Sequence, residues 1–450
     1  MVKEIIIIGS GAAGITAASS ARKTDPNAKI TVITEDTDIS YSPCAIPWGI
    51  EGKITWESMI MNTPKDYSVK KKIDVLTETR VDSVDDSAKT VSAAGRTYKY
   101  DSLIIAAGGK VFVPPINGTD LKGVFTVRTI RDGKNIQRYA DDIDSVVICG
   151  AGVIGLELAL ALLHMGKEVT VVEMFDHIIP RIADKDMADQ MQTYLESIGI
   201  KFILGAPVQS VTGTGKVGGV VAGGKEYKCE MAVFATGVRA NIDIPKQLGF
   251  EIGQFGAAMV SPTLQPYKKG RLIPDIYLAG DMIQCESAVM PGPTMSQLGS
   301  SAVRQGNVAG INAAGGKTLF GRVASPWVSV MEEMEIAGTG LSLGLASWHG
   351  IDIVSGKASG LTRARYYPDA KEMTVKILAD SVTHKIIGAQ IIAGEGTTGR
   401  IDWLTSAIIS GITAEDFLVR SENAYCPPTS MVKDVVMSAA EDLCKKFKAL

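Results

Sequence analysis

Two stretches of the chain repeat the same order of apolar runs, glycines and helix-like segments. Continuous apolar runs are typical of parallel strands that are buried on both faces. These runs occupy residues 5–8, 29–34, 146–149 and 168–172. Between the runs of each stretch lies a Gly-x-Gly-x-x-Gly pattern followed by an apolar helical segment, with glycines Gly9, Gly11 and Gly14, and Gly150, Gly152 and Gly155. The pattern predicts two β-α-β units.

Each of these units ends in a carboxylate at a spacing that suits a dinucleotide. Glu35 follows Gly14 by 21 residues, and Glu173 follows Gly155 by 18. The first glycine permits a sharp turn, the second lets a pyrophosphate approach the backbone, and the third lets helix and strand pack closely. The helix N-terminus then faces the phosphate, and the carboxylate accepts hydrogen bonds from ribose hydroxyls. The sequence therefore predicts two dinucleotide sites.

Three later apolar runs end in small residues, and the C-terminal part of the chain has a different pattern of apolar and polar positions. The runs are residues 100–108, 231–237 and 276–281, the last ending in Asp281. Ligands of open α/β sheets bind at such carboxyl ends. A helix is predicted over residues 299–314. Beyond Gly316 the pattern predicts antiparallel strands at 374–378 and 385–392 and helices at 400–409 and 429–447. This part carries no nucleotide fingerprint and is predicted to be a third domain.

Composition narrows the class of protein further. A chain of 450 residues is about right for three domains. Its 46 Lys+Arg balance 49 Asp+Glu, which argues against a nucleic acid or an anionic membrane as partner. Six cysteines without a Cys-x-x-Cys pair and four histidines without ligand spacing predict no metal site. No run approaches the length of a membrane span, so we expect a soluble, cytoplasmic protein.

The two fingerprints and the strand ends at Gly108, Gly237 and Asp281 resemble the FAD- and NAD(P)H-dependent disulfide oxidoreductase superfamily. The resemblance implies an α/β protein with two Rossmann-like domains, an FAD domain being interrupted by an NAD(P)H domain. A C-terminal α+β dimerisation domain follows. The implied boundaries are 1–112 and 245–322 for the FAD domain, 113–244 for the NAD(P)H domain and 323–450 for the dimerisation domain.

The resemblance also implies the residues that bind FAD and NADH. In the FAD domain these are Gly9, Ser10, Gly11, Ala12, Ala13, Gly14, Glu35, Ser42, Val81, Ala107, Gly108, Asp281 and Ala302. In the second domain they are Gly150, Gly152, Val153, Ile154, Gly155, Glu157, Glu173 and Gly237. The Glu173 carboxylate favours free ribose hydroxyls and repels a 2′-phosphate, so NADH is expected over NADPH. The nearby Arg181 keeps NADPH open. Ala107 and Ser301 depart from the usual residues of the family.

The predicted chemistry depends on Cys44, in the segment Ser-Pro-Cys-Ala-Ile-Pro. Ser42 and Pro43 suit the start of a helix, where the positive dipole end would favour a thiolate, although Pro47 limits the helix. No second cysteine stands nearby, so Cys44 can hold a sulfenate, a persulfide or a mixed disulfide but no internal dithiol. This resembles the single-cysteine branch: coenzyme A disulfide reductases, persulfide reductases, NADH peroxidases and NADH oxidases. Ala12 stands where the peroxidases have a catalytic histidine.

Two C-terminal segments resemble tyrosine motifs of the coenzyme A disulfide reductases. They contain Tyr425, and Tyr366 with Tyr367. The resemblance implies a homodimer in which these tyrosines reach the active cysteine of the other subunit and protonate a leaving thiolate. Cys426 replaces an alanine of the family. It is either a second redox thiol delivered across the interface or a small packing residue.

Three functional hypotheses follow. The leading one is an NAD(P)H-dependent flavoprotein that reduces a disulfide or persulfide at Cys44, with coenzyme A disulfide, coenzyme A persulfide or polysulfide as substrate. Coenzyme A is thus a further candidate ligand. The second is an NADH oxidase that reduces oxygen through a Cys44 sulfenate. The third is an electron-transfer subunit that reduces a protein partner and does not need Cys44.

Overall fold

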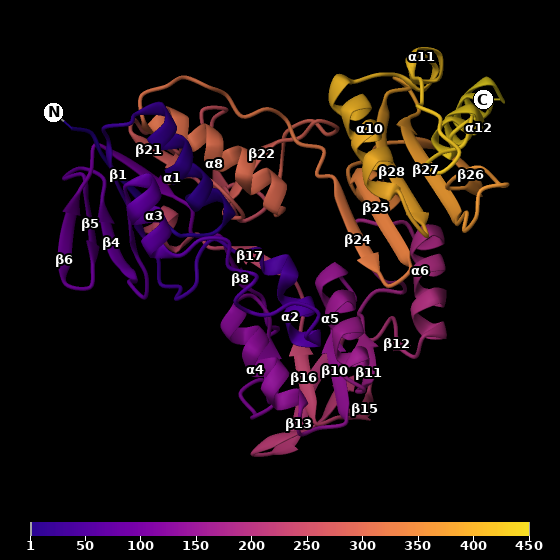
Figure 1. The fold of residues 1–450 in the computed structure, drawn as a ribbon, viewed down its shortest axis with the longest axis horizontal. Helices are drawn as coiled ribbons and strands as arrows, with labels where there is room; N and C mark the ends of the chain where they lie inside the picture. Colours follow the sequence, from indigo (N-terminus) through magenta and orange to yellow (C-terminus); the bar gives the residue numbers. More distant parts are fainter. Residues whose placement is uncertain (1, 450) are drawn as a thin grey trace.

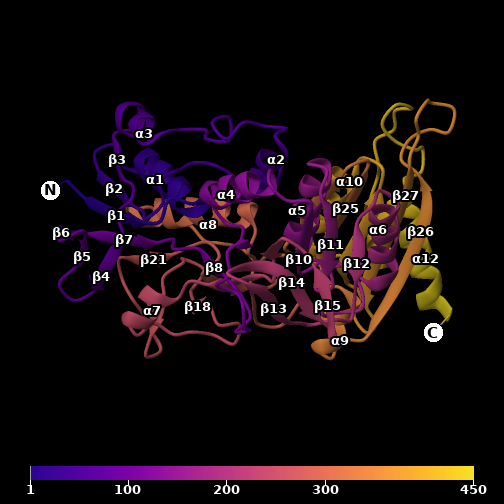
Figure 2. The ribbon, with the colours of Figure 1, turned by 90° about the horizontal axis from the view of Figure 1, so that it is seen from below.

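The computed structural model describes residues 2–449 and is built around three five-stranded sheets (Figure 1). The first sheet is parallel throughout. Its strand order is β21 (Ile276–Leu278), β7 (Ser102–Ile105), β1 (Glu4–Ile8), β2 (Lys29–Ile33) and β3 (Ile73–Leu76). Helices α1 (Ala12–Thr24), α3 (Pro64–Lys71) and α8 (Gly299–Ala313) cover one face, and a three-stranded meander lies on the other (Figure 2). The meander comprises β4 (Val81–Asp85), β5 (Thr90–Ala93) and β6 (Arg96–Lys99).

The second sheet is also parallel, and it is inserted between the strands of the first. Its order is β12 (Lys201–Ile203), β11 (Glu168–Val172), β10 (Ser145–Cys149), β16 (Met231–Phe234) and β9 (Val124–Thr126). Its helices are α4 (Ile130–Ala140), α5 (Val153–His164) and α6 (Lys185–Ser197). Strand β21 and helix α8 return to the first sheet afterwards, so the prediction of an interrupted α/β domain is confirmed. The boundaries at 112, 244 and 322 stay predictions.

The third sheet is antiparallel. Its order is β24 (Trp327–Met331), β25 (Met334–Gly340), β28 (Ile386–Ala393), β27 (Glu372–Asp380) and β26 (Ile353–Leu361). Helices α10 (Thr397–Ser410), α11 (Ala414–Arg420) and α12 (Val435–Ala449) pack against it. The two predicted strands and the helix at 400–409 are confirmed. The predicted start of the last helix at Thr429 is wrong, because the amides of Thr429 and Ser430 turn back to the Cys426 carbonyl.

Shorter elements connect these layers. The helical ones are η1 (Pro43–Ala45), α2 (Ile46–Glu51), α7 (Asp243–Gln247) and α9 (Leu343–Trp348). The strands are β8 (Gly109–Val111), β13 (Val208–Thr214), β14 (Lys216–Ala222), β15 (Lys225–Lys228), β17 (Val238–Ala240), β18 (Ala258–Met259), β19 (Tyr267–Lys268), β20 (Arg271–Leu272), β22 (Ile283–Glu286) and β23 (Pro293–Thr294). Among residues 2–449, no helix combines the length and apolar composition needed to cross a bilayer.

The segment after Cys44 packs on the second domain rather than on the first. Ile46 and Ile50 are buried in the same apolar cluster as residues of α4 and α5. The Gln137 side chain, on α4, donates to the carbonyl oxygens of Gly49 and Ile50 at 3.1 and 2.9 Å. Helix α2 therefore belongs to the first domain by sequence but is held by the second.

The third domain meets the second through a buried ion pair. Lys376 Nζ, on β27, lies 2.9 Å from Asp184 Oδ2, and both side chains are almost fully buried. The Asp184 amide donates to Gln390 Oε1 at 2.7 Å, and the Leu343 amide donates to Asp184 Oδ1 at 2.7 Å. These contacts hold the start of α6 against the third sheet.

Candidate active site

The two glycine fingerprints form loops of the same geometry. Gly9 and Gly150, the first glycines, have φ angles of +99° and +112°, and side chains rarely adopt such angles. A Cβ on the third glycine would lie 2.0 Å from the Gly9 carbonyl oxygen in one loop and 2.1 Å from that of Gly150 in the other. A Cβ on the second, Gly11 or Gly152, would meet no atom within 4 Å. The free space beside this glycine is where a pyrophosphate can approach the backbone.

Loop residues of the first domain meet at the carboxyl edge of its sheet. Gly9 packs against the Ala106 carbonyl, and Gly280 packs against Ala13. The predicted site residues gathered at this edge are Ser10, Ala12, Gly14, Ala107, Gly108, Asp281 and the buried Ala302 of α8. Glu35 is exposed just after β2, and Val81 begins β4. An elongated ligand that crosses the glycine loop can reach Asp281 from there.

Arg128 is a site residue that the sequence analysis missed. It follows β9 at the carboxyl edge of the second sheet, and its Nη2 donates to Asp281 Oδ2 at 2.8 Å. The same nitrogen would lie 3.4 Å from a Cβ on Gly108. The position of Arg128 after a strand was the available signal in the sequence, but its partner Asp281 lies 153 residues further along the chain. Arg128 joins the two predicted sites across the domain boundary.

Glu173 is the best-anchored acid of the second site. Its Oε2 accepts from the Ala151 amide at 2.8 Å, and its Oε1 accepts from the Phe175 amide at 3.1 Å. The side chain is nearly buried at the end of β11, beside the glycine loop. Val153 and Ile154 begin α5, and Gly237 stands beyond the end of β16. The carboxylate is therefore held at the edge where a ribose would lie.

Glu157, on α5, faces the third domain instead of standing in open solvent. Ser329 Oγ donates to its Oε1 at 2.6 Å. Burial raises the pKa of the Glu157 carboxyl, although the hydrogen bond from Ser329 opposes this. Its predicted contact with a cofactor stays a prediction.

Cys44 is exposed, and a helical segment begins at Pro43 with Ser42 in the N-cap position, as predicted, although this segment is short. Residues Pro43–Ala45 form a single 3₁₀ turn that runs on into the short helix α2. The Ser42 side chain makes no capping hydrogen bond. The dipole of a long helix therefore does not act on this thiol, because Pro47 and Gly52 confine α2 to six residues. Exposure, not a helix terminus, distinguishes Cys44.

The six cysteines divide into two groups. Cys44 and Cys426 are exposed, whereas Cys149, Cys229, Cys285 and Cys444 are buried. Burial raises the pKa of the Cys229 and Cys285 thiols to about 12, and it also raises that of Cys149 and Cys444. Buried thiols with raised pKa values are poor nucleophiles. Only the two exposed thiols of the described chain suit redox chemistry with an external substrate.

The three predicted tyrosines lie on loops of the third domain. Tyr366 and Tyr367 stand between β26 and β27, and Tyr425 stands between α11 and α12. The Tyr366 and Tyr425 hydroxyls are 2.7 Å apart, and all three side chains are exposed. The hydrogen bond with Tyr366 raises the pKa of the Tyr425 hydroxyl. Within residues 2–449 of one chain, no hydrogen bond joins these tyrosines to the Cys44 segment.

Comparison with known proteins decides the family. Residues 3–306 match the family model "Pyridine nucleotide-disulphide oxidoreductase", and residues 326–435 match the dimerisation domain of the same proteins. The chain belongs to the pyridine nucleotide-disulphide oxidoreductase family.

Named relatives of this oxidoreductase divide between two activities. An NADH oxidase of Methanocaldococcus jannaschii is 44% identical over 98% of this chain and 99% of its own length. An NAD(P)H coenzyme A polysulfide/persulfide reductase of Pyrococcus horikoshii is 31% identical, again over 98% and 99%. The solved NAD-dependent persulfide reductase from A. fulgidus has a TM-score of 0.94 at 30% identity, covering 99% of this chain and 84% of its own.

The family uses FAD and NAD(H), and the loops of this oxidoreductase fit both groups. The open space beside Gly11 and beside Gly152 can take a pyrophosphate. Glu35 and Glu173 stand one strand away from these glycines, where ribose hydroxyls can reach them. The matched dimerisation domain indicates a homodimer. Within residues 2–449, no group of three His, Cys, Asp or Glu side chains is arranged to hold a metal ion.

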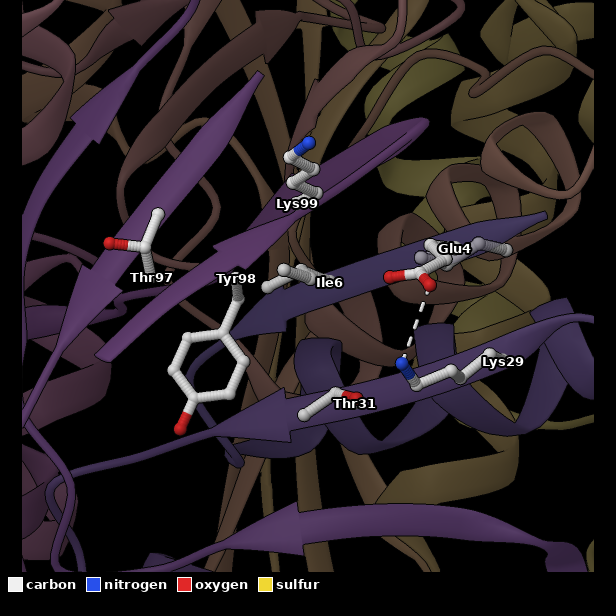
Figure 3. A pocket seen from close by; sticks show the side chains of 8 residues that line it. Glu4, Ile6, Lys29, Thr31, Thr97, Tyr98 and Lys99 are labelled. Atoms are coloured by element: carbon white, nitrogen blue, oxygen red, sulfur yellow. Dashed lines mark hydrogen bonds and ion pairs between the residues drawn. The ribbon is translucent and has the colours of Figure 1, made fainter. Parts of the chain in front are cut away.

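Two surface hollows of the oxidoreductase lie away from these loops. One, of about 240 Å³, opens between the sheet and the meander of the first domain, with Lys29, Tyr98 and Lys99 on its walls (Figure 3). The Lys29 ammonium pairs there with Glu4 at 3.3 Å. The other, of about 600 Å³, is lined by Tyr277 and Asn312 near the end of α8. Neither contains a predicted site residue.

Proposed function

We propose that the protein passes electrons from NADH to a sulfur–sulfur bond at Cys44, with coenzyme A disulfide, coenzyme A persulfide or polysulfide as substrate. The observation that carries this proposal is the exposure of Cys44 on a 3₁₀ turn whose continuation, α2, packs against the second domain. Ile46, two residues later, packs on Gly133 of α4, and α4 begins just after Arg128, which bonds Asp281. This chain of contacts keeps the thiol at the junction of the two nucleotide domains.

Bound FAD and NAD(H) supply the two electrons of the reaction. The Cys44 thiolate attacks one sulfur of the substrate R–S–S–R, so a Cys44–S–S–R bond forms and RS⁻ leaves. Two electrons and one proton then cleave this mixed disulfide, restoring the Cys44 thiolate and releasing RSH. A persulfide R–S–SH reacts in the same way and releases its outer sulfur as hydrosulfide. No second protein thiol is needed.

We propose that the tyrosines donate a hydrogen bond or a proton to the leaving thiolate. In the proposed homodimer, Tyr425 of the partner subunit would stand beside Cys44, since within residues 2–449 of one chain no hydrogen bond joins the two residues. A hydroxyl whose pKa is raised stays protonated at neutral pH, and the hydrogen bond with Tyr366 raises the pKa of Tyr425. Such a hydroxyl can donate to a departing sulfur.

Reduction of oxygen is the second candidate, and the 44% identical relative named NADH oxidase favours it. In that reaction Cys44 would hold a sulfenate instead of a mixed disulfide. Ala12, in the first glycine loop, has no side chain that can transfer a proton to a peroxide. The preference for sulfur therefore rests on the exposed thiol and on the persulfide reductases among the relatives.

An anaerobic assay of NADH consumption tests the proposal. With coenzyme A disulfide or coenzyme A persulfide, we expect turnover that Cys44→Ser lowers by at least about 10³-fold, since a hydroxyl cannot form the mixed disulfide. Cys426→Ser, which removes the other exposed thiol, is the matched control and is expected to retain turnover. Flavin content and thermal midpoint verify that each variant is folded.

Other outcomes lead elsewhere. No anaerobic turnover by the intact enzyme, with rapid NADH consumption once oxygen is admitted, contradicts the sulfur proposal and supports an oxidase. Full activity of Cys44→Ser with a protein acceptor supports electron transfer to a partner. Loss of sulfur turnover in Cys426→Ser shows that the second thiol takes part in the cycle.

A further inference from the structure

His164, the last residue of α5, contacts carboxylates from two other parts of the chain. Its Nδ1 lies 2.6 Å from Oε1 of Glu51, the last residue of α2. Its Nε2 pairs with Oε1 of Glu332, at the tip of the β24–β25 hairpin. These elements follow one another across the middle of the molecule in Figures 1 and 2. One imidazole thus ties the Cys44 segment, the second domain and the third domain together.

The geometry requires a protonated ring. Ionised carboxylates only accept hydrogen bonds, so each ring nitrogen must donate for both contacts to form. A neutral imidazole carries a single N–H and can satisfy only Glu51 or Glu332. Both contacts therefore coexist only while each ring nitrogen carries a proton, and loss of one proton removes one of the two hydrogen bonds.

The hairpin tip is built to present Glu332. This residue has a φ of +60°, in the left-handed region that glycine and asparagine occupy most easily. The amide of the next residue, Glu333, donates a hydrogen bond to the Tyr194 hydroxyl of α6 at 3.3 Å. This bond fixes the hairpin tip to the second domain. A glutamate in a strained turn, next to an anchored amide, places its carboxylate on His164.

Among the described charged groups around His164, no other residue contacts both Glu51 and Glu332. Lys53 Nζ lies 2.8 Å from the same Glu51 Oε1, so that carboxylate is shared. Glu333 pairs with Lys371 at 3.6 Å, and Glu168, at the start of β11, pairs with Lys201 at 3.3 Å. Lys167 donates to the Ile143 carbonyl instead of an acid. No lysine or arginine among the described residues pairs with Glu332, which leaves His164 as its cation.

The contact at Glu51 bears on Cys44 because α2 continues directly from the turn that holds the thiol. Glu51, the last residue of the helix, follows Cys44 by seven positions, roughly 10 Å at the α-helical rise. The Gln137 bonds hold the Gly49 and Ile50 carbonyls from the side of α4. His164 holds the same end of α2 from the side of α5. A helix this short moves as one piece.

We propose that His164 is a positioning residue for Cys44, whose protonated ring fastens the end of α2 to the second domain and to the hairpin of the third. Loss of the proton releases one of the two carboxylates and loosens α2. The importance of this for catalysis rests on the proposed function of Cys44, but the structural effect does not.

Hydrogen exchange of the amides of α2 and its C-cap, residues 46 and 48–52, tests the proposal in the FAD-loaded enzyme without substrate. Rates at pH 5.5 and 8.5 are divided by the intrinsic exchange rate at each pH. For the native chain we expect the corrected exchange rate at pH 8.5 to be about five-fold higher than at pH 5.5. This factor corresponds to the loss of one partly exposed charged contact. His164→Gln should exchange fast at both pH values, and His164→Arg, always charged and with several donors, slowly at both.

Two further variants test whether the pH dependence of exchange is specific to the His164 contacts. His384→Gln removes a histidine that pairs with a single carboxylate, Glu415, in the third domain, and should follow the native pH course. Glu332→Ala, which removes the second acceptor, should exchange at the same corrected rate at both pH values, because a neutral ring can still donate to Glu51. In parallel, kcat with the sulfur substrate should follow α2 protection across pH, with the KM for NADH unchanged. An identical pH course of α2 exchange in the native chain and His164→Gln overturns the proposal. Because the exchange measurement uses no substrate, an enzyme that reduces oxygen instead of sulfur leaves its outcome unaffected.

Discussion

Glu173 shapes the second glycine loop, and we predict that the same side chain selects the coenzyme. Its carboxylate oxygens each accept a backbone amide, from Ala151 and from Phe175, so its position is fixed before any ligand arrives. Its charge disfavours a 2′-phosphate at the same place. Glu173→Gln is therefore expected to lower kcat/KM for NADH by about 10- to 100-fold, the size of one or two hydrogen bonds to a charged group, and that for NADPH much less.

The measurement is the ratio of kcat/KM for the two coenzymes. Glu168→Gln, at the exposed start of the same strand, is the matched control and should leave the ratio within two-fold of the native value. An equal loss with both coenzymes would assign Glu173 a purely structural role in the loop.

Single residues were predictable from the sequence where a motif fixes their neighbours. The glycines of both fingerprints could be assigned because the turn, the open space and the close packing all lie within a few residues of each other. Arg128 and His164 could not, since their partners Asp281 and Glu332 are more than 150 residues away along the chain. Only the fold brings those charges together.

At the scale of elements, the crossing of α1 and α8 supports the FAD-type loop. Gly306 and Gly310 of α8 face Ala13 and Ala17 of α1, and a Cβ on either glycine would lie 2.2 Å from a carbonyl oxygen of α1. Both obstacles are backbone atoms, so the helices would have to separate. Gly310→Ala is expected to destabilise the domain by about 1–3 kcal/mol, measured as a lower midpoint of thermal flavin release.

Gly399→Ala makes the same change in α10, where an added Cβ meets no atom within 4 Å. There alanine should be neutral or stabilising by up to about 1 kcal/mol, because it has the higher helix propensity. Flavin release at the native temperature in Gly310→Ala would mean that the two helices do not depend on this close approach.

Elements with a strong repeating pattern were predicted well, and irregular ones were not. The apolar runs of both parallel sheets and the helix at 299–313 follow directly from periodicity. The helix start at Ser42 and Pro43 and its limit at Pro47 were predicted, but the packing of α2 was not, because its partner α4 is far along the chain. The late start of α12 has a similar origin, since loop hydrogen bonds at Cys426 compete with the helix.

At the scale of the whole molecule, the arrangement of domains depends on polar contacts that periodicity does not reveal. Asp184 and Lys376 are buried where the second domain meets the third, and Lys376 also lies 2.7 Å from Asp186 Oδ1. Burial alone would raise the pKa of the Asp186 carboxyl, but hydrogen bonds from Lys357 and Lys376 outweigh it and lower the pKa. This contribution to stability is present above the pKa of an unfolded aspartate and is lost as the pH falls through the lowered value.

Removal of the buried Lys376 should therefore lower the stability of the domain contact more than removal of the partly exposed Lys357. Lys376→Met leaves Asp184 as an uncompensated buried charge and is expected to destabilise the contact between the domains by roughly 3–5 kcal/mol. Lys357→Met, which removes a partly exposed partner of Asp186, should lose about 1 kcal/mol or less. Adding Asp184→Asn to Lys376→Met removes the unpaired charge and should recover most of the loss. Calorimetric unfolding of the four proteins at pH 7 measures this, and a Lys376→Met variant as stable as the native chain would show that the buried pair does not hold the domains together.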